Sequence, residues 1–516
     1  MWIGDGKGRN GCWPPHGTQS IIPRADDGKP IADAPCVGAG ITTLNVKEHD
    51  APMELKNLEE TGHAVAALAT GNGEALDRLV WTGVFGPPEL RDAARAGVMK
   101  QALSAGLYPA SIHDFYMARG RGEAPASFTV PAINIRGAAY DTARALFRAR
   151  KRLDVGAVIC EIARSEISYT DQRPSEYTFV LLAAALREGW KGPIFLQGDH
   201  FQINAKKYAA DARAEIKAVQ DITAEGLQAG FYNIDVDSST MVDLSKQGHE
   251  AQQALNGQLC AEITAFIRGR EPRGVTVSVG GEIGEVGGRN STPEELQAFM
   301  KVYRGALARI APGAAGISKI SIQTGTSHGG VPLPDGTIAQ VQLDFEALEQ
   351  LSKIARERYG LAGAVQHGAS TLPAGLFNRF PQLGACEIHL ATEFQNMLLD
   401  HPAFPGGLKH EIYERLRAAA ADERKPSDTD EQFFYKTRKK ALGLFKRELW
   451  GLPAAAREAI GRTLEDKFVF LFTQLNLSGT RGLIEKWAPM VPGSYPDLAA
   501  GAAAVKASED VSGLSD

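Results

Sequence analysis

The 516-residue sequence lacks a long hydrophobic run, since no stretch approaches the roughly 18 apolar residues that a membrane-spanning helix needs. It also has little cysteine. The five cysteines are scattered without a CxxC pair, which predicts reduced thiols in a cytoplasmic protein rather than a disulfide framework. Neither sign of charge dominates, because 56 Lys and Arg residues face 61 Asp and Glu residues, a net charge of −5. Without a basic excess, we expect neither a nucleic acid nor a membrane as a partner.

Three common cofactor and metal motifs are also missing. The dinucleotide-binding fingerprint GxGxxG follows none of the strand-like segments, and no GK[ST] segment of a nucleoside triphosphate site is present. The HExxH motif is absent, which argues against a zinc protease site carried on a helix.

The two ends of the chain differ in composition from its middle. Residues 1–52 are rich in Gly, Pro and Asp, lack any periodicity or signal peptide, and are predicted to be a disordered tail. Alternatively, the native start is Met53, because helical pattern begins there. We expect an N-terminal helical segment over 53–127, with helices over 53–118, and a small, polar, disordered tail over 499–516.

Eight short apolar, β-branched segments alternate with amphipathic helical patterns in the middle of the chain. This alternation predicts an α/β fold, a (β/α)8 TIM barrel over residues 128–395, with a doubly wound open sheet as the competing architecture. The predicted strands are 128–135, 155–163, 192–198, 230–236, 274–281, 317–325, 361–368 and 384–391.

A C-terminal helical extension is predicted over 396–498. Within it, apolar residues at helical spacing predict one helix over 428–453 and another over 464–477. We expect these helices to wrap the barrel or to build an oligomer interface.

Histidines and carboxylates follow several of the predicted strands. Asp199 and His200 end the third strand, Glu282 ends the fifth, and His328 and His367 follow the sixth and seventh. Because the carboxyl ends of barrel strands share one rim, these side chains predict a metal site there. Three imidazoles with an open position suit catalytic zinc, although cobalt, manganese or iron compete by ligand type.

Seven segments carry a resemblance to a known family. In order they are FTVPAINIRGAAYDTARALF, GDHFQINAKKY, AGFYNIDVDSS, VGGEIGEVGG, GTSHGG, VQHGAS and CEIHLATE. Over about residues 128–395 this ordered set resembles the class II, metal-dependent fructose-bisphosphate and tagatose-bisphosphate aldolases, of which the chain looks like a divergent member.

The resemblance implies a role for individual residues. It makes His200, His328 and His367 the zinc ligands, Glu282 an alternative ligand and Asp199 the general acid/base. Asp235 is assigned to the support of the site. Contacts to the substrate are expected at Asn134, Arg164, Gly329, Gly368, Ser370, Thr371, His389 and Thr392.

Departures from the family pattern fall near the expected phosphate site. Ala369 stands where the family has a glycine, His389 where it has an asparagine, and Glu387 where it has a lysine. Glu387 places negative charge where an anion would bind, which weakens phosphate binding. Alternatively, it points into the barrel wall and pairs with a cation, for which Arg164 and Arg289 are the candidates.

The sequence thus predicts a cytoplasmic, zinc-dependent lyase of the class II aldolase type. It would act on a ketose or ketose (bis)phosphate by retro-aldol C3–C4 cleavage through a metal-stabilised enediolate. The alternative is a metal-dependent epimerase that inverts C4 of a free ketose or ketohexuronate by cleavage and re-addition. A third possibility is a non-catalytic aldolase-like subunit. The resemblance also implies a homo-oligomer, a dimer or a tetramer.

Overall fold

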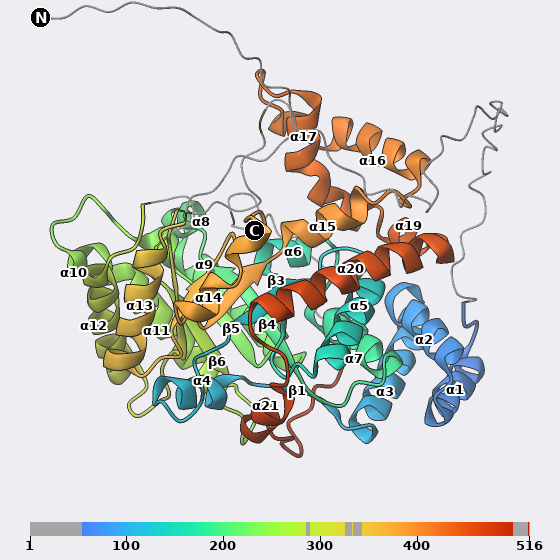
Figure 1. The fold of residues 1–516 in the computed structure, drawn as a ribbon, viewed down its shortest axis with the longest axis horizontal. Helices are drawn as coiled ribbons and strands as arrows, with labels where there is room; N and C mark the ends of the chain where they lie inside the picture. Colours follow the sequence, from blue (N-terminus) through green and yellow to red (C-terminus); the bar gives the residue numbers. More distant parts are fainter. Residues whose placement is uncertain (1–53, 285–288, 326–332, 334–342, 499–513, 515–516) are drawn as a thin grey trace, which may run out of the picture. The chain divides into compact units, whose positions relative to one another are not determined.

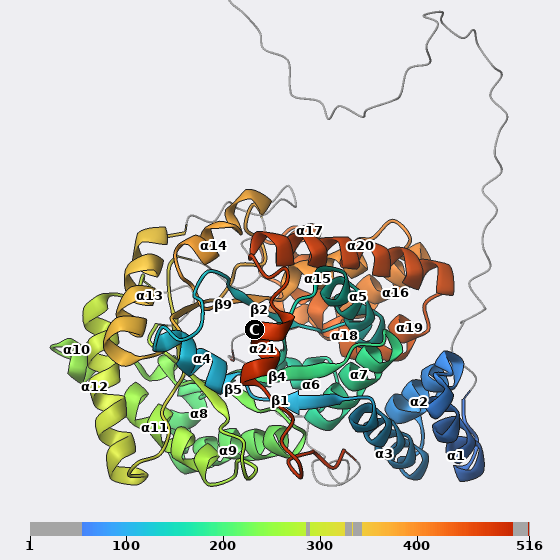
Figure 2. The same ribbon diagram turned by 60° about the horizontal axis from the view of Figure 1, so that its bottom comes forward.

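Eight parallel strands close into a barrel (Figures 1 and 2). The computed structural model describes residues 54–284, 289–325, 333, 343–498 and 514. The barrel order is β4-β3-β2-β9-β8-β7-β6-β5, and β5 pairs back onto β4. This closing pair confirms the predicted barrel and excludes the open sheet. The strands are β2 (Val130–Asn134), β3 (Ile159–Ala163), β4 (Gly192–Gln202), β5 (Asn233–Asp237), β6 (Ser278–Glu282), β7 (Lys319–Ile322), β8 (Ala364–Gln366) and β9 (Glu387–Leu390).

Helices on the outside return the chain from each strand to the next. Their ends follow the sequence: Thr292 and Glu295 form a capping box at the start of α12, and Asp344 caps α13 through the N–H of Ala347. The helices are α5 (Ala139–Leu153), α6 (Arg164–Tyr169), α7 (Pro174–Arg187), α8 (Ala205–Ala210), α9 (Ala212–Gln228), α10 (His249–Gln252), α11 (Ala254–Arg268), α12 (Pro293–Ile310), α13 (Phe345–Tyr359), α14 (Arg379–Gln382) and α15 (Thr392–Leu399).

A ninth strand lies in the N-terminal segment, where helices alone were predicted. Helices α1 (Leu58–Ala67), α2 (Gly73–Phe85) and α3 (Pro88–Ser104) match the prediction, but β1 (Leu107–Ala110) then pairs with the first half of β4. Four residues are too few to show a periodicity of their own, and β1 forms because β4 offers it an edge.

Helices α4 (His113–Gly120) and α21 (Arg481–Trp487) lie over the amino-terminal end of the barrel (Figure 2). The Tyr108 hydroxyl of β1 donates to the carbonyl of Ala488 at 3.0 Å, just beyond α21. From α4, the Tyr116 hydroxyl donates to Glu387 Oε2 at 2.5 Å, inside the barrel. The elements that lie over the amino-terminal end of the barrel form its floor. Through Tyr116, the floor is hydrogen-bonded to the polar interior of the barrel.

The C-terminal extension packs on the barrel helices. Helix α16 (Gly406–Ala419) comes first, and α20 (Ala454–Gln474) packs along α5. Helix α20 also contacts α15, where the ring of Phe394 lies 4.9 Å from the ring of Phe468. The single helix predicted over 428–453 is wrong. It is split into α17 (Asp430–Thr437), α18 (Ala441–Leu444) and α19 (Lys446–Trp450), with a 3-10 turn at Arg438–Lys440 between the first two, and Gly443 within α18 lies close to the backbone of Tyr169. The residues at helical spacing are nevertheless buried: Phe434, Thr437, Arg438, Ala441, Phe445 and Leu449.

Some predictions fall outside the described residues. These are the tail over 1–52, the tail over 499–516 apart from Leu514, and the site residues His328 and Gly329. Within the described ranges, we find no helix with both the length and the apolarity required to cross a bilayer.

Candidate metal centre

A bulge in β4 presents the two adjacent residues Asp199 and His200. The strand does not end at Gly198 as predicted, but continues to Gln202 with a shift of register between Gly198 and Phe201. His200 has a positive φ of 38°, which is uncommon for a non-glycine residue and marks local strain. The bulge re-aims both side chains, and such strain is typical of functional sites.

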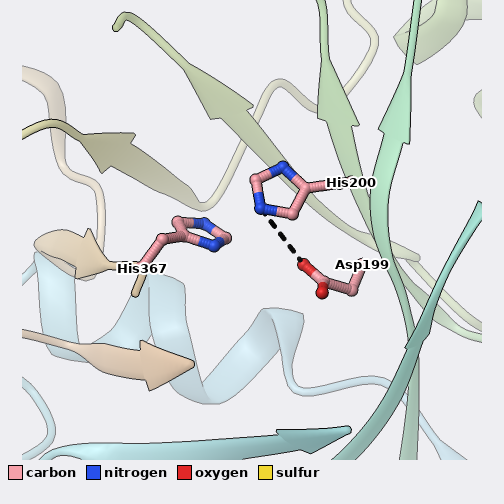
Figure 3. A group of neighbouring side chains, drawn as sticks. All are labelled: Asp199, His200 and His367. Carbon is pink, nitrogen blue, oxygen red and sulfur yellow. Dashed lines mark ion pairs between the residues drawn. The ribbon is translucent and has the colours of Figure 1, made fainter. Parts of the chain in front are cut away.

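Asp199 and His200 meet His367, which follows β8 (Figure 3). One ligand-type atom from each of the three residues lies within 4.8 Å of the others. The rings of His200 and His367 are 4.2 Å apart between centroids, and all three side chains are buried. The structure thus brings together three of the residues that the sequence placed on one rim.

Glu282 and Asp237 surround the other side of the His200 ring. His200 Nδ1 lies 3.1 Å from Asp237 Oδ2 and 3.4 Å from Glu282 Oε2. Glu282 ends β6 as predicted, and Asp237 ends β5. Asp237 was not among the predicted site residues, although its place at a strand end was a visible signal.

The electrostatics of this group favour positive charge. Burial alone would lower the pKa of His200, but Asp199 and Glu282 raise it well above its ordinary value. Burial, with the neighbouring Asp237, raises the pKa of Glu282 to about 7. A divalent cation bound to these nitrogen and oxygen atoms would supply the positive charge that the carboxylates favour. Imidazole and carboxylate together are ligands that zinc accepts. The residues present therefore fit a metal.

A second group of four buried residues adjoins the first and includes Asp199. It consists of Glu161, Asp199, Asp235 and His389, whose ligand-type atoms also lie within 4.8 Å of one another. His389 Nδ1 is 3.1 Å from Glu161 Oε1 and 3.3 Å from Asp199 Oδ1. His389, predicted to contact substrate, therefore lies among carboxylates, 4.0 Å from the His367 ring between centroids.

Glu387 points into the barrel and pairs with a cation, which is the second of the two expected alternatives. Its partner is neither Arg164 nor Arg289, as proposed from the sequence, but Lys319 of β7. The Lys319 ammonium also lies 2.9 Å from Asp235 and donates to Gln197 Oε1 at 2.8 Å. Burial alone would raise the pKa of Glu387, but Lys319 and His389 lower it to about 2.

The two arginines offered as partners are engaged elsewhere. Arg164 lies 2.6 Å from Glu215 Oε1 and donates to the carbonyl of Gln202, with a fully buried side chain. Arg289 pairs with Glu295 at the start of α12. Among the described residues, the guanidinium of Arg164 is thus bound by α9 and β4.

Asn134 and Thr392 lie at opposite ends of a polar chain that leads to Asp199. Asn134 Nδ2 donates to Asp199 Oδ2 at 2.8 Å and to Glu166 Oε2 at 2.9 Å. Glu166 in turn pairs with Arg136 at 2.5 Å, and Arg136 donates to Thr392 Oγ1 at 3.4 Å. This chain fixes the orientation of the Asp199 carboxylate.

The loop after β8 holds the remaining described substrate-contact candidates. Gly368 has a φ of 67°, a left-handed conformation that glycine adopts without strain. Ser370 Oγ accepts the N–H of Ala391 at 2.7 Å and so ties this loop to the end of β9. Thr371 Oγ1 is buried without a hydrogen-bond partner in the described part of the chain.

Sequence reasoning missed the interior lysine and its neighbours. Lys319, Gln197 and Tyr116 hold the carboxylates inside the barrel, and the first two point inward from strands. The signal was a lysine in the middle of the apolar segment ISKISI, because a fully buried lysine needs carboxylate partners.

A family model described as fructose-bisphosphate aldolase class-II matches residues 124–448. Solved structures with similar folds include the YdjI aldolase from Escherichia coli K12, at 13% identity over 73% of this chain and 99% of that chain, with a TM-score of 0.42. A probable tagatose 6 phosphate kinase from Sinorhizobium meliloti 1021 matches at 17% identity, over 72% and 97% of the two chains, with a TM-score of 0.49. The fructuronate-tagaturonate epimerase UxaE from Cohnella laeviribosi, in complex with one glycerol, matches at 12% identity, over 75% and 86%, with a TM-score of 0.51.

Proposed function

Because the chain belongs to the class II fructose-bisphosphate aldolase family, we propose that it is a zinc-dependent lyase that cleaves or forms the C3–C4 bond of a ketose or ketose phosphate. The observation that supports this most directly is the meeting of Asp199, His200 and His367 inside the barrel. These three combine metal-binding nitrogens with a carboxylate for proton transfer.

His200 and His367, with Glu282 as an alternative ligand and His328 from the sequence motif GTSHGG, would hold the metal. When bound, a zinc ion supplies a Lewis acid that polarises the ketose oxygens and stabilises the negative charge that develops on C–C cleavage. Asp237 Oδ2 lies 3.1 Å from His200 Nδ1, and a hydrogen bond there would orient the ring so that Nε2 is the nitrogen offered to the metal.

Asp199 is the proposed proton-transfer group. Burial alone would raise the pKa of its carboxyl, but His200 and His389 hold the pKa well below its ordinary value, so the group is ionised at neutral pH. Asn134 fixes Oδ2 at 2.8 Å, and Oδ1 has no hydrogen bond within the described structure. We therefore assign to Oδ1 the uptake of the proton of the C4 hydroxyl as the C3–C4 bond breaks, and its return when the bond forms.

A C4 epimerase of a free ketose or ketohexuronate is the second candidate. It is favoured by the pairing of four cations in and around the barrel, since Arg136, Arg164, Arg289 and Lys319 each contact a carboxylate. Cations already neutralised in this way are poorly suited to hold two phosphates. The same residues would then cleave the bond, retain the aldehyde and re-form the bond on its other face.

One incubation separates the two candidates. Zinc-loaded protein is given fructose 1,6-bisphosphate and tagatose 1,6-bisphosphate in one arm, and fructose, tagatose and tagaturonate in the other, and products are followed by NMR. Triose phosphates that disappear with EDTA support the lyase. Interconversion of the unphosphorylated ketoses or ketonates supports the epimerase, and no EDTA-sensitive product from any substrate contradicts both.

A further inference from the structure

Three ligand-type atoms converge beside the proposed zinc site, and their mutual geometry is not that of regular hydrogen bonds. Glu161 Oε1 and Asp199 Oδ1 lie 3.1 Å and 3.3 Å from His389 Nδ1. All three atoms are buried, and none of them makes a hydrogen bond of regular geometry among the described residues, so they are held together as an ion-paired group. Two oxygens and a nitrogen lie at the separations that ligands of one metal ion have. They face one another, but at angles that do not suit a hydrogen bond. This is the arrangement of ligands around a cation.

The other oxygen of each of these carboxylates is held from outside the group. Gln197 Nε2 donates to Glu161 Oε2 at 2.8 Å, and Asn134 Nδ2 donates to Asp199 Oδ2 at 2.8 Å. Each carboxylate is thus oriented by a neutral amide, with its remaining oxygen directed to His389. Outer hydrogen bonds of this kind orient the ligands in metal sites.

The charge in this part of the barrel points the same way. Besides the Arg136–Glu166 pair, the described residues place six buried carboxylates in and at the rim of the barrel, and the one lysine that pairs with any of them is Lys319, which contacts Asp235 and Glu387. The six carboxylates are Glu161, Asp199, Asp235, Asp237, Glu282 and Glu387. Burial raises the pKa of Glu161 to about 8. Burial alone would lower the pKa of His389, but the carboxylates around this imidazole raise its pKa well above its ordinary value, so the group gathers positive charge at His389. A divalent cation at the same place would supply that charge in another form, because buried carboxylates without a cation are strongly unfavourable.

We propose that Glu161, Asp199 and His389, with Asp235 as a fourth member, bind a second divalent cation next to the proposed zinc. The site goes beyond the proposed function, which needs one metal. Three carboxylates and one imidazole form an oxygen-rich set, which suits a hard divalent cation such as Mn²⁺ better than a thiolate-seeking one. Asp199 belongs to both groups of ligands, so a cation on its Oδ1 competes with proton uptake at that atom.

The test counts metals on the full-length protein. The protein is stripped with a chelator, loaded with ZnCl2, freed of excess, then titrated with MnCl2, and both metals are measured per chain by mass spectrometry. Two cations are expected per wild-type chain. Glu161→Gln and His389→Gln should each weaken Mn²⁺ binding by more than about tenfold while zinc is kept. The control Asp221→Asn, an exposed carboxylate on α9, should still bind two.

Each failure has a separate meaning. If the wild type binds one cation and His367→Ala removes it, the second site is overturned and the proposed function is left intact. His389 then neutralises the neighbouring carboxylates as an imidazolium. A wild type that binds none overturns the metal of the proposed function as well. Full Mn²⁺ binding by folded Glu161→Gln and His389→Gln overturns the assignment of the ligands, and circular dichroism verifies the fold of both. If neither variant folds, the wild-type count decides.

Discussion

Lys319 and Glu387 pair inside the barrel, and neither side chain has any measurable exposure to solvent. They come from β7 and β9, and β8 lies between these strands. The interior of a TM barrel is normally filled by branched apolar side chains. Here charged side chains fill part of that space. Through Asp235 and His389 they contact residues of the candidate metal centre.

Replacing Lys319 by Met should destabilise the protein strongly, because Asp235 and Glu387 would be left buried without their cation. The expected loss is about 3–5 kcal/mol of the free energy of unfolding. The control is Lys217→Met: its ion pair with Asp221 is 68% and 62% exposed, so the loss should stay below about 1 kcal/mol. Thermal unfolding compares the two, and equal losses would contradict a structural role for the interior pair.

His367→Ala should remove the proposed zinc and the activity while the fold persists. The side chain contributes a ligand atom, and its Nε2 has one described partner of its own, Ser321 Oγ at 3.0 Å. Metal analysis and circular dichroism measure the two effects separately. Zinc content equal to that of the wild type would show that His367 is not a ligand.

Asp199→Asn should leave zinc on the histidines and slow the reaction by about 10²- to 10⁴-fold, the usual contribution of a positioned acid or base. The amide cannot accept the proton of the C4 hydroxyl, although it keeps the size of the side chain. Steady-state rates with whichever substrate the NMR incubation shows to react provide the measurement, with Asp221→Asn as the control. A rate close to that of the wild type would exclude Asp199 from proton transfer.

Gly443→Ala should loosen the C-terminal extension. A Cβ at this position would overlap the backbone oxygen of Tyr169, at the end of α6, so α18 could not keep its place. We expect a loss of about 1–3 kcal/mol, seen as a lower melting temperature. The control Gly482→Ala in α21 meets open space and should be neutral or slightly stabilising. A melting temperature unaffected by Gly443→Ala would show that this contact does not hold the extension.

The stability of the protein should fall below pH 6.5 because of His113. Burial in α4 lowers the pKa of this imidazole to about 4, from 6.5 in the unfolded chain. The unfolded state therefore binds the proton first, and stability is lost as pH falls from 6.5 toward 4. About 2 kcal/mol should be lost between pH 7.5 and pH 5.

The variant His113→Gln tests this assignment. Its melting temperature should decline less than that of the wild type between pH 7.5 and pH 5, whereas His63→Gln, at an exposed position on α1, should follow the wild type. Identical declines in all three proteins would rule out His113 as the source.

The sequence predicted the barrel because alternating strand and helix patterns are local properties. The same holds for the rim residues, since Glu282 and His367 stand at strand ends as expected. The bulge at Asp199 and His200 was missed because it depends on how β4 pairs with β5. No pattern within β4 encodes that pairing.

The interior charges were missed for a similar reason. The partners of Lys319 lie 84 and 68 residues away along the chain, at Asp235 and Glu387. From the sequence alone, Glu387 stands where the family has a lysine, and two arginines were suggested as its partner. Only the closed barrel shows that the cation facing Glu387 is Lys319. Contacts between strands that are distant in sequence require the register of the whole sheet.

The floor of the barrel is supplied from both ends of the chain, and this has a consequence for its synthesis. Tyr108 of β1 is bound by the carbonyl of Ala488, and Tyr232 donates to the carbonyl of Ser494. When the last residue of β9 has been synthesised, roughly a hundred residues that complete the floor are still to be made, which takes about 5–20 s at ordinary translation rates. The nascent barrel, with its acidic interior, spends that time open at its amino-terminal end.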